Sequence, residues 1–215
     1  QIQFADHRRF SGTACSRIEE VRGGACLFLT GAIGGLMTPD SKADNFYEAH
    51  RIGTRLADLA LELKPSPGKP KAAALDFFRE TVLVPVENSR YLLFLKALTF
   101  GHDLKDALGR PIPASRALWL TAKHASSGLD EADRPWVETE VSRLDLGPVR
   151  VLGIPAEIFP ELVIGGYDGR LRAGWPLLSE KNPDPPDLSK APKGPYLRDL
   201  LGGGAGMVVG LANDE

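Results

Sequence analysis

The sequence has few of the residues that mark a metal site or a disulfide scaffold. Among its 215 residues there are only two cysteines and four histidines. They form no CxxC, HxxxH or HExxH spacing, so local spacing alone identifies no zinc site. No GxSxG or GK[ST] motif is present, which argues against a serine hydrolase or a phosphate-binding loop. No apolar run approaches the roughly 20 residues that cross a bilayer, and no signal-peptide pattern opens the chain.

A strong charge of either sign is also missing. The formal net charge is −2, and the lysines and arginines are scattered along the chain. This distribution predicts neither a nucleic-acid partner nor binding to an anionic membrane. Hydrophobic residues make up 43% and charged residues 25%, which is ordinary for a soluble globular protein. A chain of this length is able to form one large domain or two small ones, and it can bury a sizeable core without disulfides. Of the two arrangements we expect a single domain over residues 1–215.

The two cysteines, Cys15 and Cys26, lie eleven positions apart. This separation is compatible with a disulfide and equally with two buried thiols, so the redox compartment stays open.

Periodic apolar patterns predict a mixture of helices and strands. The clearest helix covers residues 43–64, where apolar residues recur at three- and four-residue steps. Asp44 is its expected N-cap and Pro65 ends it. A short helix is expected around residues 14–21, and the compact apolar run at 25–30 is typical of a buried strand.

The second half of the chain is richer in strand patterns. A long or bent strand is expected at residues 73–87, and two runs separated by "GP" within 136–153 predict a hairpin. A short helix follows the hairpin, residues 174–198 form a long proline-rich loop, and the last strand lies in "GMVVGLAND". Residues 1–5 fit the end of a strand, and residues 88–98 fit a helix or a strand. Without strict βαβ alternation, these elements predict an α+β or mixed α/β fold with a mixed sheet and packed helices.

Two polar features stand next to predicted strands. The glycine-rich stretch "GAIGGLMTPD" follows the run at 25–30, and it reads either as a tight bend or as the wall of a site that includes Thr38. Glu157 follows the second hairpin strand, between two prolines. A carboxylate there serves as a helix cap, a general base or a metal ligand.

Of the histidines, we expect His50 to flank the main helix, and His102 and His124 to lie in polar loops.

Four segments taken together resemble the neutral/alkaline non-lysosomal ceramidase family, above all its bacterial ceramidase-like members of unassigned substrate. They are, in this order, "ACLFLTGAIGGLMTPD", "FYEAHRIGTRLADLALE", "LGPVRVLGIPAEIFPEL" and "VVGLANDE". The resemblance covers most of the chain, but only the later part of the family's catalytic domain. Both ends of the sequence interrupt strand-like runs, which fits a portion of a larger zinc amidase-like domain.

The resemblance implies a zinc amidase that splits the N-acyl bond of ceramide into sphingosine and fatty acid. In the family, zinc is held by two histidines, a glutamate and a tyrosine. His7 in "FADHRR" matches the place of the second histidine, with Arg8 where proline is usual, and Glu157 in "PAE" matches the glutamate. The first histidine would precede Gln1, and the tyrosine would follow Glu215.

The resemblance also implies a catalytic role for Thr38, which stands where the family has an active-site serine, while Leu36 replaces an acid. These departures suggest a changed substrate or a lost activity. The implied partners are an N-acyl lipid substrate and an upstream fragment of the same protein that completes the site, and the implied location is secreted or surface-associated. A catalytically inactive relative that binds or assembles is the alternative function.

Overall fold

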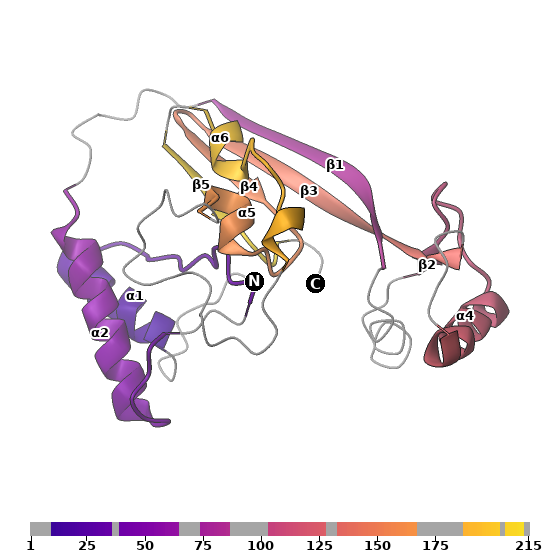
Figure 1. The fold of residues 1–215 in the computed structure, drawn as a ribbon. Coiled ribbons are helices and arrows are strands. Elements are labelled where there is room, and N and C mark those ends of the chain that lie inside the picture. The colour runs from indigo at the N-terminus through magenta and orange to yellow at the C-terminus, as the bar shows by residue number, and fades with distance from the viewer. Residues whose placement is uncertain are drawn as a thin grey trace.

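The computed structural model describes residues 10–35, 39–64, 74–86, 103–127, 133–166, 187–202 and 205–212. A sheet lies at the centre, helices α1 and α2 lie together at one side of it, and α4 lies beyond the opposite end (Figure 1). Helices and a mixed sheet in one chain confirm the expected α+β class. The predicted strand at 1–5 and the helix or strand at 88–98 lie outside the described residues.

The sheet has the strand order β1-β3-β4-β5, with the short β2 paired to β3 beyond the end of β4. The strands are β1 (Leu75–Pro85), β2 (Leu104–Lys105), β3 (Trp136–Leu146), β4 (Val149–Gly153) and β5 (Ala205–Val209). β1 pairs with β3 along its whole length, and β3 and β4 form the predicted hairpin. β4 and β5 are parallel, so their carboxyl ends lie side by side. The long strand, the hairpin and the last strand are therefore confirmed.

Helices α1 (Phe10–Arg22) and α2 (Phe46–Glu62) confirm both helices predicted in the first half. The N-cap of α2 is Asn45 and not Asp44, because the Asn45 side chain accepts a hydrogen bond from the Glu48 N–H. The two helices meet at Gly53, where a Cβ would collide with the Phe10 carbonyl and with the Thr13 side chain. This close approach buries small residues of both helices.

Several large apolar side chains of α2 are exposed, and the residues that the helix buries most deeply are not among them. The residues that α2 buries are Glu48, Gly53 and Ala57. Phe46 is 72% exposed and Leu63 is 71% exposed, and Leu56 and Leu59 are also exposed. The predicted apolar stripe is thus present in the helix, but its largest side chains remain exposed, while Ala49, Ile52 and Ala60 are half-buried.

The expectation of a buried strand at residues 25–30 is wrong. This segment is extended, with a single bridge residue at Phe28 and an exposed Leu27 and Leu29. An apolar run becomes a strand only when a neighbouring strand accepts its backbone hydrogen bonds, and the described residues give this segment no ladder.

Helix α4 (Ala114–Ser127) occupies a stretch that carried no predicted element, and His124 lies in it rather than in a loop. The helix buries Ala117 and Leu120, and Ala117 packs with Val86 and Leu104 in a small core that Ile112 and Val137 extend.

The predicted short helix after the hairpin is confirmed as α5 (Pro160–Ile164). The described part of the proline-rich segment holds a 3-10 turn, η2 (Leu188–Lys190), and a short helix, α6 (Leu197–Leu200).

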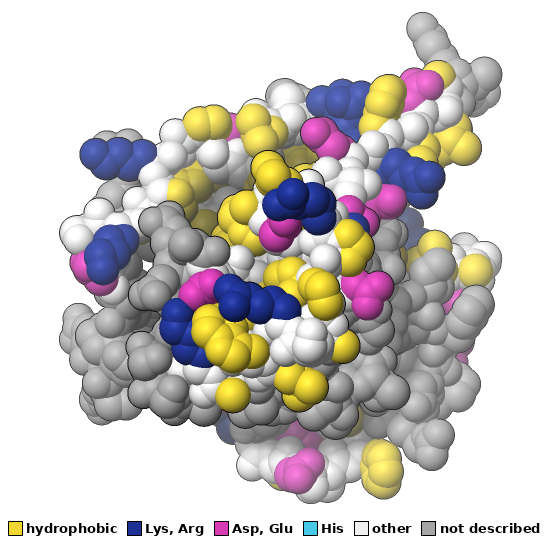
Figure 2. Space-filling model, turned by 90° about the vertical axis from the view of Figure 1, so that its right-hand side faces the viewer, with side chains coloured by type: hydrophobic (Ala, Val, Ile, Leu, Met, Phe, Trp, Pro, Cys, Tyr) yellow, Lys and Arg dark blue, Asp and Glu magenta, His cyan; other side chains and the backbone are white. Residues whose placement is uncertain are grey.

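The face at the α4 end mixes hydrophobic side chains with basic and acidic ones (Figure 2). On α4, the Arg116 guanidinium lies 3.9 Å and the Lys123 ammonium 5.1 Å from the ring centre of Trp119. Both cations also pair with Asp133. No helix within the described ranges is long and apolar enough to span a membrane.

Candidate functional site

Three segments that are far apart in the sequence meet at the carboxyl ends of β4 and β5. The turn at 154–159 leaves β4, the segment 210–212 leaves β5, and the glycine-rich segment 30–35 runs against both. Ends of adjacent parallel strands are common places for ligand-binding loops. This junction contains Glu157 and the start of the glycine-rich stretch, so the structure brings together two of the features that the sequence singled out.

Backbone hydrogen bonds hold the junction together. Ile154 N–H donates to the Val209 carbonyl at 2.9 Å, and Leu211 N–H donates to the Ala156 carbonyl at 3.1 Å, so the two strand ends continue to pair. The glycine-rich segment joins them through a bond of 3.0 Å from Gly210 N–H to the Thr30 carbonyl. Bonds of this kind fix backbone position without using any side chain, which leaves the side chains of the turn available.

Glycine is required at the closest contacts in this junction. Gly34 N–H donates to the Ile158 carbonyl at 2.8 Å, and a Cβ on Gly34 would lie 2.5 Å from the carbonyl oxygen of Glu157. A Cβ on Gly210 would lie 2.6 Å from the Gly31 carbonyl oxygen. Both distances are shorter than real Cβ contacts. The glycine-rich stretch therefore is a tight packing element, and it also forms one wall beside Glu157.

Glu157 itself is exposed at this junction. Within the described part of the chain, no hydrogen bond or ion pair engages its carboxylate. An exposed, unpaired carboxylate directly after a strand is able to accept a cation or a proton, and it does not cap α5, whose N-cap is Phe159 without a side-chain bond. The cap role considered from the sequence is therefore wrong.

The other two predicted site residues, His7 and Thr38, lie outside the described residues. Among the residues that are described, no three histidine, cysteine, aspartate or glutamate side chains converge as a metal site. Glu157 is thus the single predicted zinc ligand whose position is known. A carboxylate oxygen is an ordinary zinc donor, so its chemistry fits the implied metal.

A second carboxylate in this region, Glu161, was not identified from the sequence. It belongs to α5, is only 5% exposed, and its Oε2 atom is buried without a partner among the described residues. Buried polar atoms normally have a hydrogen-bond partner, so an orphaned carboxylate oxygen calls for an explanation. No sequence signal separates it from Glu157, since Glu157 stands two residues after Pro155 and Glu161 stands directly after Pro160.

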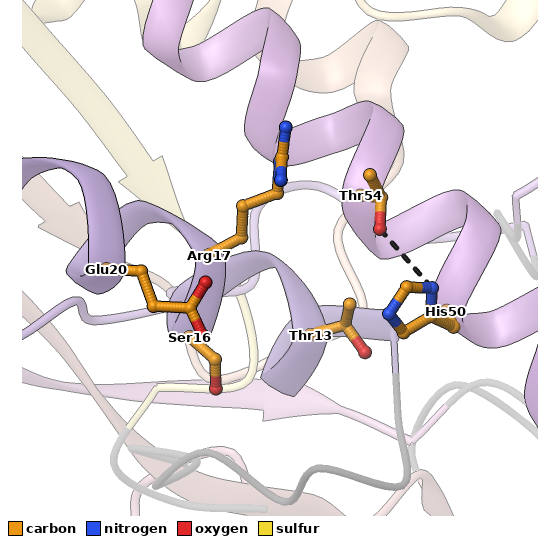
Figure 3. Close-up of a pocket in the computed structure, with 6 residues that line it drawn as sticks. All are labelled: Thr13, Ser16, Arg17, Glu20, His50 and Thr54. Carbon is orange, nitrogen blue, oxygen red and sulfur yellow. Dashed lines mark hydrogen bonds between the residues drawn. The ribbon is translucent and has the colours of Figure 1, made fainter.

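A separate polar pocket of about 290 Å³ lies between α1 and α2 (Figure 3). Its lining residues are Thr13, Ser16, Arg17 and Glu20 of α1 with His50 and Thr54 of α2. Thr54 Oγ1 lies 3.5 Å from His50 Nδ1, and Arg17 is held by Asp58 through an Nε–Oδ1 bond of 2.8 Å. A hydroxyl at that distance is poorly activated, and the described residues place no carboxylate against the other ring nitrogen of His50. The described residues that line this pocket therefore form no nucleophilic triad.

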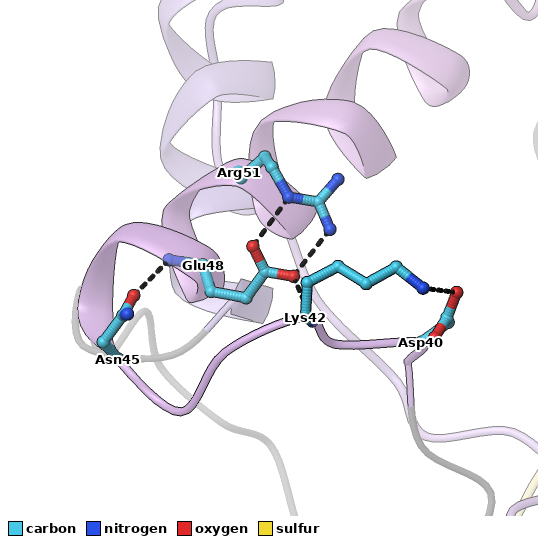
Figure 4. A network of polar contacts seen from close by, with 5 residues as sticks. All are labelled: Asp40, Lys42, Asn45, Glu48 and Arg51. Carbon is cyan, nitrogen blue, oxygen red and sulfur yellow. Dashed lines mark hydrogen bonds and ion pairs between the residues drawn. The ribbon is translucent and has the colours of Figure 1, made fainter.

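The start of α2 carries a compact network of charges (Figure 4). Arg51 donates to both carboxylate oxygens of Glu48 at 2.7 Å, and Lys42 N–H donates to Glu48 Oε1 at 2.7 Å. The Lys42 ammonium pairs with Asp40. The Arg51 hydrogen bond, aided by the Lys42 amide, lowers the pKa of Glu48 to about 2. The network fixes the segment 40–45 against the helix, and it explains why α2 buries an acid.

No protein-family model matches the chain, and no curated protein or solved structure matches it.

Proposed function

We propose that this chain is part of a zinc-dependent amide hydrolase that acts on ceramide or a related N-acyl lipid. The proposal rests on the sequence resemblance to ceramidases together with one observation, the exposed carboxylate of Glu157 at the strand-end junction, which has no partner among the described residues. The glycine-rich wall supports it, because it packs against the backbone of the turn that carries Glu157 and fixes that turn through backbone contacts.

In this proposal Glu157 is a zinc ligand and His7 is a second ligand. Zinc, when bound, would lower the pKa of a bound water and polarise the amide carbonyl. The chain's own part is to present the Glu157 carboxylate from a turn that is fixed by backbone hydrogen bonds at both of its ends. Thr38, which follows the glycine-rich wall in sequence, would face the acyl substrate. The remaining ligands would come from an upstream fragment of the same protein, and a secreted or surface location goes with the same proposal.

The test is zinc content and N-acyl cleavage in the full-length parent protein. We expect about one zinc per chain by elemental analysis after gel filtration, and release of fatty acid from a ceramide substrate. Glu157→Ala should lose both, because one of four ligands is removed. Glu62→Ala, which removes an exposed carboxylate on α2, is the matched control and should retain both. Zinc and turnover unchanged by Glu157→Ala would refute the proposal.

Glu161→Gln separates the two neighbouring carboxylates. Because Glu161 is buried within α5, this nearly isosteric change should leave zinc stoichiometry unchanged. Loss of zinc in Glu161→Gln with retention in Glu157→Ala would refute the assignment of Glu157 and would identify Glu161 as the ligand instead.

A catalytically inactive relative is the second candidate function. The sequence departures favour it, since Arg8, Leu36 and Thr38 replace residues that the family uses in or near its site. This alternative predicts a full-length protein that folds normally, contains no zinc and releases no fatty acid.

A further inference from the structure

Cys15 and Cys26 lie next to each other although one belongs to α1 and the other to the segment that follows it. After α1 ends at Arg22, Gly23 and Gly24 adopt φ values of +73° and +79°, which reverse the chain direction. The returning segment therefore runs back along the helix that precedes it.

Two further contacts fix the returning segment on α1. Cys26 N–H donates to Glu19 Oε1 at 2.7 Å, and the ring of Phe28 meets that of Phe10 edge-on, with 6.0 Å between centres. The contacts lie on either side of Cys15 along the helix. They hold Cys26 over the turn of α1 that carries Cys15, close enough for the Cys26 thiol to influence the pKa of Cys15.

The two thiols differ in their access to solvent. Cys15 is 3% exposed, whereas Cys26 is half-buried. Burial, together with the hydrogen bond to Cys26, raises the pKa of Cys15 to about 11, so Cys15 is held as a neutral thiol near neutral pH. A soluble oxidant therefore reaches Cys26 first, and Cys15 is the residue positioned to react next.

We propose that Cys15 and Cys26 form a reversible disulfide by exchange with a low-molecular-weight disulfide such as oxidised glutathione. In the first step the Cys26 thiolate attacks one sulfur of the glutathione disulfide, which gives a mixed disulfide and releases one glutathione thiolate. In the second step Cys15 gives up its proton to water and its sulfur attacks the Cys26 sulfur, which releases the second glutathione. The protein loses two electrons and two protons, and the glutathione disulfide takes up both. The bond would tie the returning segment, and with it the start of the glycine-rich wall, to α1.

The experiment equilibrates the reduced, folded chain with defined ratios of reduced and oxidised glutathione. Samples are trapped with acid and alkylated, and digested with trypsin. We expect both thiols to disappear together and the peptides 10–17 and 23–42 to be recovered as one cross-linked species. The same titration in a denaturing concentration of guanidinium chloride gives the unfolded reference. Because folding brings the thiols together, the equilibrium constant for the disulfide should be roughly tenfold or more higher in the folded chain.

Single-cysteine variants test the order of the two steps. In Cys15→Ser, Cys26 should accumulate as the glutathione adduct, since the residue that resolves it is gone. In Cys26→Ser, Cys15 should remain a free thiol for as long as the chain stays folded, as circular dichroism would show. The proposal is overturned if the wild-type chain gives two glutathione adducts, or cross-links between two chains. An equilibrium constant no higher in the folded than in the unfolded chain would also overturn it.

Discussion

The guanidinium of Arg51 holds the carboxylate of Glu48 in a two-pronged contact, with Nε to Oε2 and Nη2 to Oε1 both at 2.7 Å. Paired geometry of this kind is stronger than a single hydrogen bond, and here it is reinforced by the Lys42 N–H. Glu48 is buried, so the contact is screened less than a fully exposed ion pair.

This contact should make stability depend on pH in a defined window. The pKa of Glu48 falls from 4.5 to about 2 in the folded chain, so its contribution is fully present above pH 4.5 and is lost as the pH falls towards 2. Replacing it by Glu48→Gln should lower the urea midpoint at pH 6, and the wild-type and variant curves should converge near pH 2. Glu62→Gln serves as a control, for which no such convergence is expected. Parallel curves for Glu48→Gln across the whole range would contradict this assignment.

The contact between α1 and α2 depends on Gly53. Alanine at this position would gain about 1 kcal/mol of helix propensity, but its Cβ would lie 2.6 Å from the Thr13 Cβ. Overpacking of a close contact costs about 1–3 kcal/mol, so the steric penalty should win. We expect Gly53→Ala to lower the free energy of unfolding by about 1 kcal/mol in urea denaturation. A variant as stable as the wild type, or more so, would show that the helices can separate without loss.

The hairpin carries a cross-strand pair that should respond to salt. Asp145 and Arg150 are opposite each other in the β3–β4 register, with Nε to Oδ1 at 2.8 Å and Nη2 to Oδ2 at 3.1 Å. Arg150 holds the pKa of Asp145 below its usual value. Asp145→Asn should lower the melting temperature at low ionic strength, and the difference should shrink in 1 M salt because screening acts on the pair. An equal difference at both ionic strengths would assign the effect to packing and not to charge.

Elements whose signals are local could be predicted from the sequence. The alternation on either side of "GP" predicted the hairpin, and the three- and four-residue spacing predicted α2. Both patterns repeat within a few residues, so they need no knowledge of the rest of the chain. The capping residue was misplaced by one position, because aspartate and asparagine are adjacent at 44–45 and both are good N-caps.

Features that depend on distant partners could not be predicted. Residues 25–30 have a strand-like composition, but β-propensity becomes a strand only when a neighbour supplies the ladder. The contact face of α2 was hidden for a similar reason: the helix uses Gly53 and Ala57 against α1 and turns its larger side chains elsewhere. Local periodicity shows that a helix has an apolar side, but it does not show which neighbour covers that side.

In the candidate site, too, the features that depend on local sequence could be predicted, and those that depend on distant segments could not. The position of Glu157 just after a strand was predicted, because it depends on the adjacent hairpin. Residues 30–35 and 210–212 meet the same turn because β4 pairs in parallel with β5, in a register that joins Val149 to Ala205 and so brings together distant parts of the chain. The burial of Glu161, and the lack of a partner for its Oε2 atom among the described residues, become visible only in three dimensions.

Two glycines of the glycine-rich wall test the junction, because Gly34 lies in close contact with the Glu157 turn and Gly31 does not. Gly34→Ala would place a Cβ 2.5 Å from the Glu157 carbonyl oxygen and 2.6 Å from the Phe159 nitrogen, and these are backbone atoms that cannot rotate away. We expect a loss of about 1–3 kcal/mol in unfolding free energy and faster amide hydrogen exchange at residues 154–159. Gly31→Ala, three residues earlier, brings its Cβ no closer than 3.9 Å to the Val208 carbonyl and should leave both measurements unchanged. Equal effects of the two substitutions would mean that backbone entropy, and not the contact with the Glu157 turn, sets the requirement for glycine here.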